Sequence, residues 1–182
     1  MKKVIFQMSV SLDGYVEGPA HELDWHIVDA PFNAFAVETL RATDVLIMGR
    51  VTYELMAGYW PTADDDDAVK EEMNTRPKLV FSRTLARVDW QNSRLATGAI
   101  AEELARLKQL PGDGLIWVGG SNLASQFLDL GLIDEIRIIL TPILLGGGHT
   151  VFGEIAKRHT LQFVSAQPFA SGNVLVRYEP VR

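Results

Sequence analysis

The chain has 182 residues, of which 47% are hydrophobic and 22% charged, and it contains no cysteine. These proportions are typical of one globular domain, and the lack of cysteine excludes disulfides, thiolate metal sites and a cysteine nucleophile. The net charge is −6 without a basic patch, so we expect no binding to nucleic acid or to an anionic membrane. No apolar run has the length of a signal peptide or a membrane span, which predicts a cytoplasmic protein with a single domain over residues 1–182.

The first strand is expected at Val4 to Val10, where residues are mostly apolar on both faces. Such strands usually lie in the middle of a sheet that is covered on both sides. The loop that follows is bracketed by glycines, and Asp13 in it is interpreted as a turn residue that holds the loop, ahead of a catalytic role. Asp29, followed by proline at position 31, predicts the N-terminus of a helix.

Three later strands end in groups that suit an anion. The strand ends and their groups are Asp44–Met48 with Gly49, Arg50 and Thr52; Pro77–Phe81 with Ser82 and Arg83; and Leu115–Val118 with Gly119, Gly120 and Ser121. Free amides at a helix start and the helix dipole favour a phosphate, and glycine lets it approach the backbone. Each turn alone also fits a plain strand-to-helix connection, and for Arg50 a surface role and an anion-binding role have equal support.

Other polar residues between these strands have simpler interpretations. Asp64 to Asp67 are expected to form an acidic helix N-terminus in solvent, in preference to a cation site. Thr97 is expected to cap a helix that stops before Pro111. The four histidines show no spacing of a metal motif, so no metal site is predicted.

The C-terminal third consists of strands without helices between them, at Leu132–Leu140, Leu161–Ala166 and Val174–Tyr178. Alternating strands and helices followed by hairpins predict an α/β fold with a mixed sheet, parallel for most of its width with an antiparallel C-terminal edge. The segment Ile133 to Leu140 is apolar on both faces and is followed by Ile143 to Leu145, which predicts a homodimer.

Taken in order, several motifs resemble the dihydrofolate reductase-like family, and in particular the reductase domain of the bifunctional riboflavin-biosynthesis deaminase/reductase. The matching segments, spread over nearly the whole chain, are Ser11–Tyr15, Met48–Glu54, Val118–Ser121, Gly131–Glu135 and Pro142–Gly148. The resemblance implies a central mixed β-sheet flanked by helices, NADPH as cofactor, and a dimer.

The resemblance also implies roles for individual residues. Gly49, Arg50 and Thr52 would contact the adenosine end and phosphates of NADPH, and Ser82 and Arg83 the 2′-phosphate. The pyrophosphate would lie on Gly119, Gly120, Ser121, Asn122 and Leu123, with a cis peptide expected between the two glycines. Ser9, Val16 and Thr141 would line the nicotinamide and substrate side.

One departure from the family concerns the substrate. Dihydrofolate reductases carry a carboxylate on the first helix, and the corresponding place here falls at or near Asn33, which cannot ionise. Asp29 and Asp13 are the alternatives for this role.

We therefore expect an NADPH-dependent reductase of a small pterin- or pyrimidine-like heterocycle that is a poor dihydrofolate reductase. The alternatives are an NADP-binding module without catalysis and a structural dimerisation domain; the three polar strand ends argue against the second of these.

Overall fold

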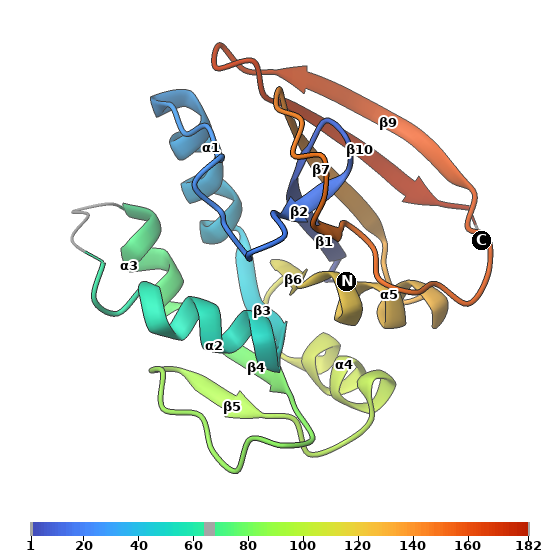
Figure 1. The fold of residues 1–182 in the computed structure, drawn as a ribbon. Helices are drawn as coiled ribbons and strands as arrows, with labels where there is room; N and C mark the ends of the chain where they lie inside the picture. The colour runs from blue at the N-terminus through green and yellow to red at the C-terminus, as the bar shows by residue number, and fades with distance from the viewer. Residues whose placement is uncertain (1, 64–67, 182) are drawn as a thin grey trace.

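The computed structural model describes residues 2–63 and 68–181, so the acidic run at 64–67 lies outside the described residues. In the described part, eight strands form one sheet (Figure 1). In sheet order they are β5 (Ser93–Leu95), β4 (Lys78–Phe81), β3 (Thr43–Gly49), β6 (Leu115–Gly119), β1 (Val4–Ser11), β7 (Glu135–Thr141), β10 (Val174–Pro180) and β9 (Leu161–Pro168). The strands from β5 to β7 are mutually parallel, whereas β10 is antiparallel to both β7 and β9. The expected mixed sheet with an antiparallel C-terminal edge is confirmed.

Helices cover both faces of the parallel part of the sheet (Figure 1). On one face are α1 (Ala30–Arg41), α2 (Arg50–Tyr59) and α3 (Ala68–Thr75), which bury Leu40, Tyr53 and Met73 against β3 and β4. On the other are α4 (Ile100–Gln109) and α5 (Ser121–Asp129), which bury Leu107 and Phe127 against β1, β3 and β6. Val4 and Phe6 in β1 have no exposed surface, so this strand is central, as its apolar pattern predicts.

Asp29 caps α1 as predicted. One carboxylate oxygen accepts a hydrogen bond from Phe32 N at 2.8 Å, and the other accepts from Ser171 N at 3.0 Å. The residue therefore fixes the start of α1 and also joins it to the turn between β9 and β10. These two hydrogen bonds of Asp29 explain why α1 packs next to the hairpin of β9 and β10.

Two predicted boundaries are wrong. Helix α4 starts after Ala99, not at Thr97, because Thr97 N and Oγ1 donate to the buried Glu103 carboxylate at 2.9 and 3.2 Å. Strand β7 begins at Glu135, three residues later than expected, because the chain first completes the end of α5. Gly131 adopts a φ of +68° there, as a helix-terminating glycine does.

A second, two-stranded sheet joins β2 (Tyr15–Glu17) to β8 (His149–Thr150). Its register pairs Tyr15 with Thr150 and Glu17 with His149. The ribbon connects the loop after β1 to the glycine-rich loop after β7. No helix within residues 2–63 and 68–181 is long and apolar enough to cross a membrane.

Candidate functional site

The polar strand ends predicted from the sequence lie side by side at the carboxyl edge of the parallel strands. In the sheet register Gly49 pairs with Phe81, and Met48 pairs with Gly119. The residues that follow these pairs, among them Arg50 and Ser82, therefore lie at adjacent strand ends. Carboxyl ends of parallel strands are where open α/β sheets bind their ligands.

Two helices start at this edge without a side-chain cap. The N-cap residues are Gly49 for α2 and Gly120 for α5, and glycine has no side chain to accept from the first helical amides. These amides and the positive ends of both helix dipoles are therefore available to an anion. Neighbouring free helix N-termini are well suited to the two charges of a pyrophosphate.

Gly120 lies against the side chain of Thr52. Its φ is +91°, and a Cβ placed on it would overlap Thr52 Oγ1. Only glycine combines this backbone conformation with so close an approach between the two turns. The next residue, Ser121, has a buried Oγ without a hydrogen-bond partner among the described residues, which is uncommon unless a ligand or water completes the site. These observations fit a bound pyrophosphate.

The prediction of a cis peptide bond between Gly119 and Gly120 is wrong. The described residues contain no cis peptide bond. The positive φ of Gly120 makes the turn instead. Leu123 is buried in the core with 6% of its surface exposed, so only its backbone is available to a cofactor. Asn122 is exposed and lies against Gly153, where an added Cβ would overlap its Oδ1.

The two predicted anion-binding arginines differ in their contacts. Arg50 Nη1 donates to Glu54 Oε2 at 2.7 Å across one helical turn, with both side chains about half exposed. Arg83 is exposed and has no salt bridge within the described part of the chain. Ser82 Oγ accepts from Thr84 N and Leu85 N at 3.1 and 2.9 Å, which shapes the turn that carries Arg83.

The residues predicted for the nicotinamide side come from three strands. Ser9 in β1 pairs with Ile139 in β7, and Ser11 pairs with Thr141. Ser9 is half-buried, whereas Thr141 has only 2% of its surface exposed, so it can reach a ligand only at the strand end. Val16 lies on β2, beside this edge.

Asp13 ties two loops together. Its carboxylate accepts hydrogen bonds from Ser11 Oγ at 2.6 Å, Leu145 N at 3.1 Å and Gly146 N at 2.8 Å. The bonds from Ser11 and the two amides lower the pKa of Asp13, so the carboxylate is ionised at neutral pH. This arrangement favours the loop-holding role over that of a proton donor.

Asn33 lies half-buried in the first turn of α1, where its backbone N–H donates to the backbone oxygen of Asp29 at 2.9 Å. Asp29 is engaged in its cap and Asp13 in its loop, so both alternative carboxylates carry structural hydrogen bonds. The described structure thus keeps an uncharged amide at the place where the resemblance implies an acid.

Sequence reasoning missed two polar clusters. Gln7 interrupts the apolar pattern of β1, and its buried Oε1 has no hydrogen-bond partner among the described residues. Gln7 pairs in register with Arg137, which in turn pairs with Arg177. The second cluster joins Glu17, His21 and His149. The cluster around Gln7 depends on the register between strands, and the cluster of Glu17, His21 and His149 depends on a contact between loops. Neither is visible in the sequence pattern.

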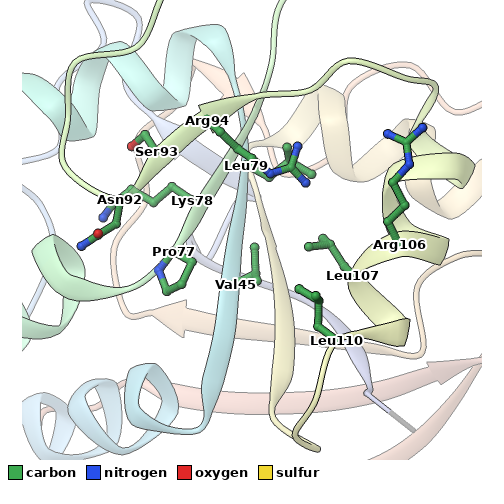
Figure 2. A pocket seen from close by; sticks show the side chains of 10 residues that line it. All are labelled: Val45, Pro77, Lys78, Leu79, Asn92, Ser93, Arg94, Arg106, Leu107 and Leu110. Atoms are coloured by element: carbon green, nitrogen blue, oxygen red, sulfur yellow. The ribbon is translucent and has the colours of Figure 1, made fainter.

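A cavity of about 340 Å³ lies at the opposite, amino edge of the sheet, among Lys78, Arg94, Arg106 and apolar side chains (Figure 2). Lys78 donates to the carbonyl oxygens of Asn74 and Arg76 at 3.1 and 2.8 Å, and burial lowers its pKa to about 8. Both arginines bind Glu103. The cations of this cavity are therefore already paired, and it does not belong to the predicted site.

Comparisons with known proteins agree with this architecture. Residues 2–175 match the family model described as the RibD C-terminal domain. The chain is 35% identical over 180 residues to Uncharacterized protein YyaP of Bacillus subtilis (strain 168), which covers 97% of this chain and 94% of YyaP. A protein from Shewanella sp. PV-4, provisionally assigned to riboflavin biosynthesis, superposes with a TM-score of 0.80 at 26% identity over 99% of both chains.

The fold also extends to dihydrofolate reductases. Dihydrofolate reductase from Enterococcus faecalis, solved as a complex with NADP(H), superposes with a TM-score of 0.66 over 99% of this chain and 97% of its own. The two sequences are only 16% identical, so this likeness shows the shared fold alone.

Proposed function

Because the chain belongs to the RibD C-terminal domain family, we propose that it is an NADPH-dependent reductase of a small planar heterocycle of the pyrimidine or pterin type. The observation that carries the proposal is the pair of uncapped helix N-termini at Gly49 and Gly120, together with the Oγ of Ser121, the first residue of α5, which has no hydrogen-bond partner among the described residues. The Enterococcus faecalis enzyme of the same fold binds NADP(H), which supports the choice of cofactor.

NADPH would supply the hydride when bound, and the protein would supply orientation and polar contacts. The first amides of α2 and α5 and the Ser121 hydroxyl would hold the pyrophosphate. Ser82 and Arg83 would hold the 2′-phosphate, because a guanidinium group forms charge-assisted hydrogen bonds with phosphate oxygens. Thr52 contacts Gly120 and so keeps the two turns at a fixed separation.

On the substrate side, the loops after β1 and β7 would close around the heterocycle. Asp13 joins these loops through Leu145 and Gly146, so it is assigned a positioning role. Ser9 and Thr141 offer hydroxyl groups at the end of β1 and β7, which can donate to or accept from ring nitrogen and oxygen atoms.

The first prediction concerns the choice of dinucleotide. Titrations of the protein with NADPH and NADH, followed by fluorescence or calorimetry, are expected to give tighter binding of NADPH. Arg83→Ala should weaken NADPH binding about 10- to 100-fold and leave NADH binding nearly unchanged, since a charge-assisted hydrogen bond contributes roughly 1.5–3 kcal/mol.

Arg87→Ala is the matched control, because Arg87 is an exposed arginine of the same segment whose Nε already pairs with Asp89 at 3.2 Å. It should leave both affinities unchanged. Equal affinities of the native protein for NADPH and NADH would contradict the cofactor assignment.

The second prediction concerns dihydrofolate. Its reduction requires protonation of a weakly basic ring nitrogen, and general acid–base assistance typically contributes a factor of about 10²–10⁴. With Asn33 in the carboxylate's place, we expect turnover far below the median enzyme rate of about 10 s⁻¹, and a measurable rise in Asn33→Asp. Steady-state oxidation of NADPH measures both.

The control for this experiment is Gln109→Glu, which makes the same chemical change at an exposed position on α4. Efficient turnover of dihydrofolate by the native protein would show that Asn33 is not at the pterin end of the pocket. The alternative function, an NADP-binding module without catalysis, would bind NADPH but reduce none of a panel of pyrimidine and pterin substrates.

A further inference from the structure

We propose that Glu17, His21 and His149 form a binding site for one divalent transition-metal ion of the Zn²⁺ type. Each residue offers one ligand atom, and the three atoms all lie within 4.8 Å of one another. His21 Nδ1 is 2.9 Å and His149 Nδ1 2.8 Å from the same Glu17 Oε1. The site uses none of the residues assigned to the cofactor.

The three ligands come from two segments, one with Glu17 and His21 and the other with His149, which the backbone holds together. Glu17 ends β2 and pairs in register with His149, the first residue of β8. Gly148 precedes His149 with a φ of +132°, and a Cβ there would overlap the Glu17 carbonyl oxygen. The close approach of the two strands therefore depends on glycine at 148, and this approach brings His149 to Glu17.

His21 reaches the same carboxylate from a tight turn. Its backbone has a φ of +63°, and His21 N donates to Gly18 O at 3.0 Å. A positive φ is uncommon for a residue other than glycine and carries a conformational cost. The imidazole rings of His21 and His149 stack with centroids 4.9 Å apart and an interplanar angle of 15°, and both Nδ1 atoms lie within 2.9 Å of Glu17 Oε1.

The ligand set selects the class of ion. Two imidazole nitrogens and one carboxylate oxygen suit Zn²⁺, Co²⁺ or Ni²⁺, whereas Ca²⁺ and Mg²⁺ prefer sites made of oxygens. Tetrahedral bonds of about 2.0–2.2 Å separate neighbouring ligand atoms by about 3.3 Å. The Nδ1–Oε1 separations need to widen by about half an ångström, and the two Nδ1 atoms, which lie within 4.8 Å of each other, need to reach about 3.3 Å. The exposed His21 and His149 side chains allow both movements, and the fourth position is left for water.

A bound ion would cross-link the loops on either side of the ribbon. The same two loops are already joined by Asp13, through its bonds to Leu145 N and Gly146 N. The ion would add a second link between these loops, and would stabilise the folded protein because it binds the folded state. The proposal rests on the β2–β8 ribbon and on the turn after β2 that carries His21, and does not depend on the reductase assignment.

The experiment uses the full chain, free of any affinity tag and treated with EDTA, then dialysed. Calorimetric titration with ZnCl₂ is expected to show one ion per chain, and CoCl₂ to give the visible absorption of a low-coordinate Co²⁺ site. Zn²⁺ should raise the Tm. His21→Ala and His149→Ala should each weaken Zn²⁺ binding by at least the 10- to 100-fold that loss of an outer-sphere partner costs in known sites.

His159→Ala is the matched control, since His159 Nε2 also pairs with a carboxylate, that of Asp129, at 2.8 Å on another part of the molecule. It should bind Zn²⁺ as the native protein does. Circular dichroism and the Tm in EDTA establish that each variant is folded. Absence of stoichiometric Zn²⁺ binding, or an equal loss in His159→Ala, would overturn the proposal and leave a hydrogen-bonded His–Glu–His cluster without an ion.

Discussion

Gly120 shows how one residue links the fold to the site. Its φ of +91° and the overlap that a Cβ would make with Thr52 Oγ1 both require glycine. The strand–glycine–helix pattern of the sequence predicts this turn correctly, because a short apolar run followed by two glycines and an amphipathic segment has few other solutions. The contact with Thr52, by contrast, depends on the neighbouring strand and is not readable from the local pattern.

Replacement of this glycine gives the third prediction. Gly120→Ala should lower the free energy of unfolding by about 1–3 kcal/mol, from the cost of a positive φ and from the contact with Thr52. Thr52→Ala in the same chain should restore part of the loss, because it removes the atom that the new methyl group meets. Urea unfolding of the two single variants and the double variant measures this coupling.

Gly131→Ala separates the two causes, since Gly131 has a φ of +68° but nothing within 4 Å of an added Cβ. It should lose only the backbone contribution, and Thr52→Ala should not rescue it. Additive effects of Gly120→Ala and Thr52→Ala would mean that the two turns do not touch.

At the scale of elements, α4 owes its start to a buried carboxylate. Glu103 has no exposed surface and accepts from Arg94 Nη2 at 2.8 Å and Thr97 N at 2.9 Å. Burial alone would raise its pKa, but these hydrogen bonds and the charge of Arg94 outweigh burial and hold the pKa of Glu103 at about 2. A threonine before an amphipathic run is a normal cap signal, so the sequence could not reveal that Thr97 serves Glu103 instead.

The fourth prediction follows from this depressed pKa. The ionised Glu103 stabilises the fold above its unfolded pKa of about 4.5, and the contribution is lost as the pH falls toward 2. Glu103→Gln should lower the free energy of unfolding at pH 7 by roughly 1–3 kcal/mol. This range is already reduced for solvent screening, because the partner arginines are about half exposed. The difference from the native protein should shrink between about pH 5 and pH 2.

Denaturant unfolding over this pH range tests the prediction, with Glu38→Gln on the exposed face of α1 as control. A Glu103→Gln variant that is as stable as the native protein at pH 7 would show that the carboxylate contributes nothing net to α4. The same holds if its deficit does not depend on pH.

At the scale of the whole molecule, the order of the strands of the main sheet and of the helices can be predicted from the sequence. Each of these strands has the length and the apolar pattern that are typical of a strand in a covered sheet. The cluster of Glu17, His21 and His149 is not predictable in this way. His149 is distant from Glu17 in the sequence and is brought to it by the β2–β8 ribbon, whereas His21 reaches Glu17 from the turn four residues later. Short-range patterns predict elements, whereas contacts between loops depend on the closed fold.

The place of the exposed apolar surface differs from what the sequence predicts. The apolar segment Ile133 to Leu140, which is expected to lack cover within one domain, is covered, because β7 lies between β1 and β10 and Ile136 and Ile139 are buried. Exposed apolar side chains occur on β9, at the sheet edge, where Phe163 and Val164 are 59% and 47% exposed, and also elsewhere on the surface, including Leu144 after β7 at 69%. An apolar edge strand is normally paired or covered in a native protein.

The fifth prediction is therefore a homodimer that uses β9, which we propose in place of a β7 interface. Light scattering at micromolar concentration should give the mass of two chains. Phe163→Glu should shift the protein to a monomer, because a charge in the centre of an apolar interface is costly to desolvate. The control is Leu110→Glu, because Leu110 at the end of α4 is 52% exposed, close to the 59% of Phe163. This variant should remain dimeric, and circular dichroism should show that both variants are folded. A monomeric native protein would contradict the dimer, while a dimeric Phe163→Glu variant would move the interface away from β9.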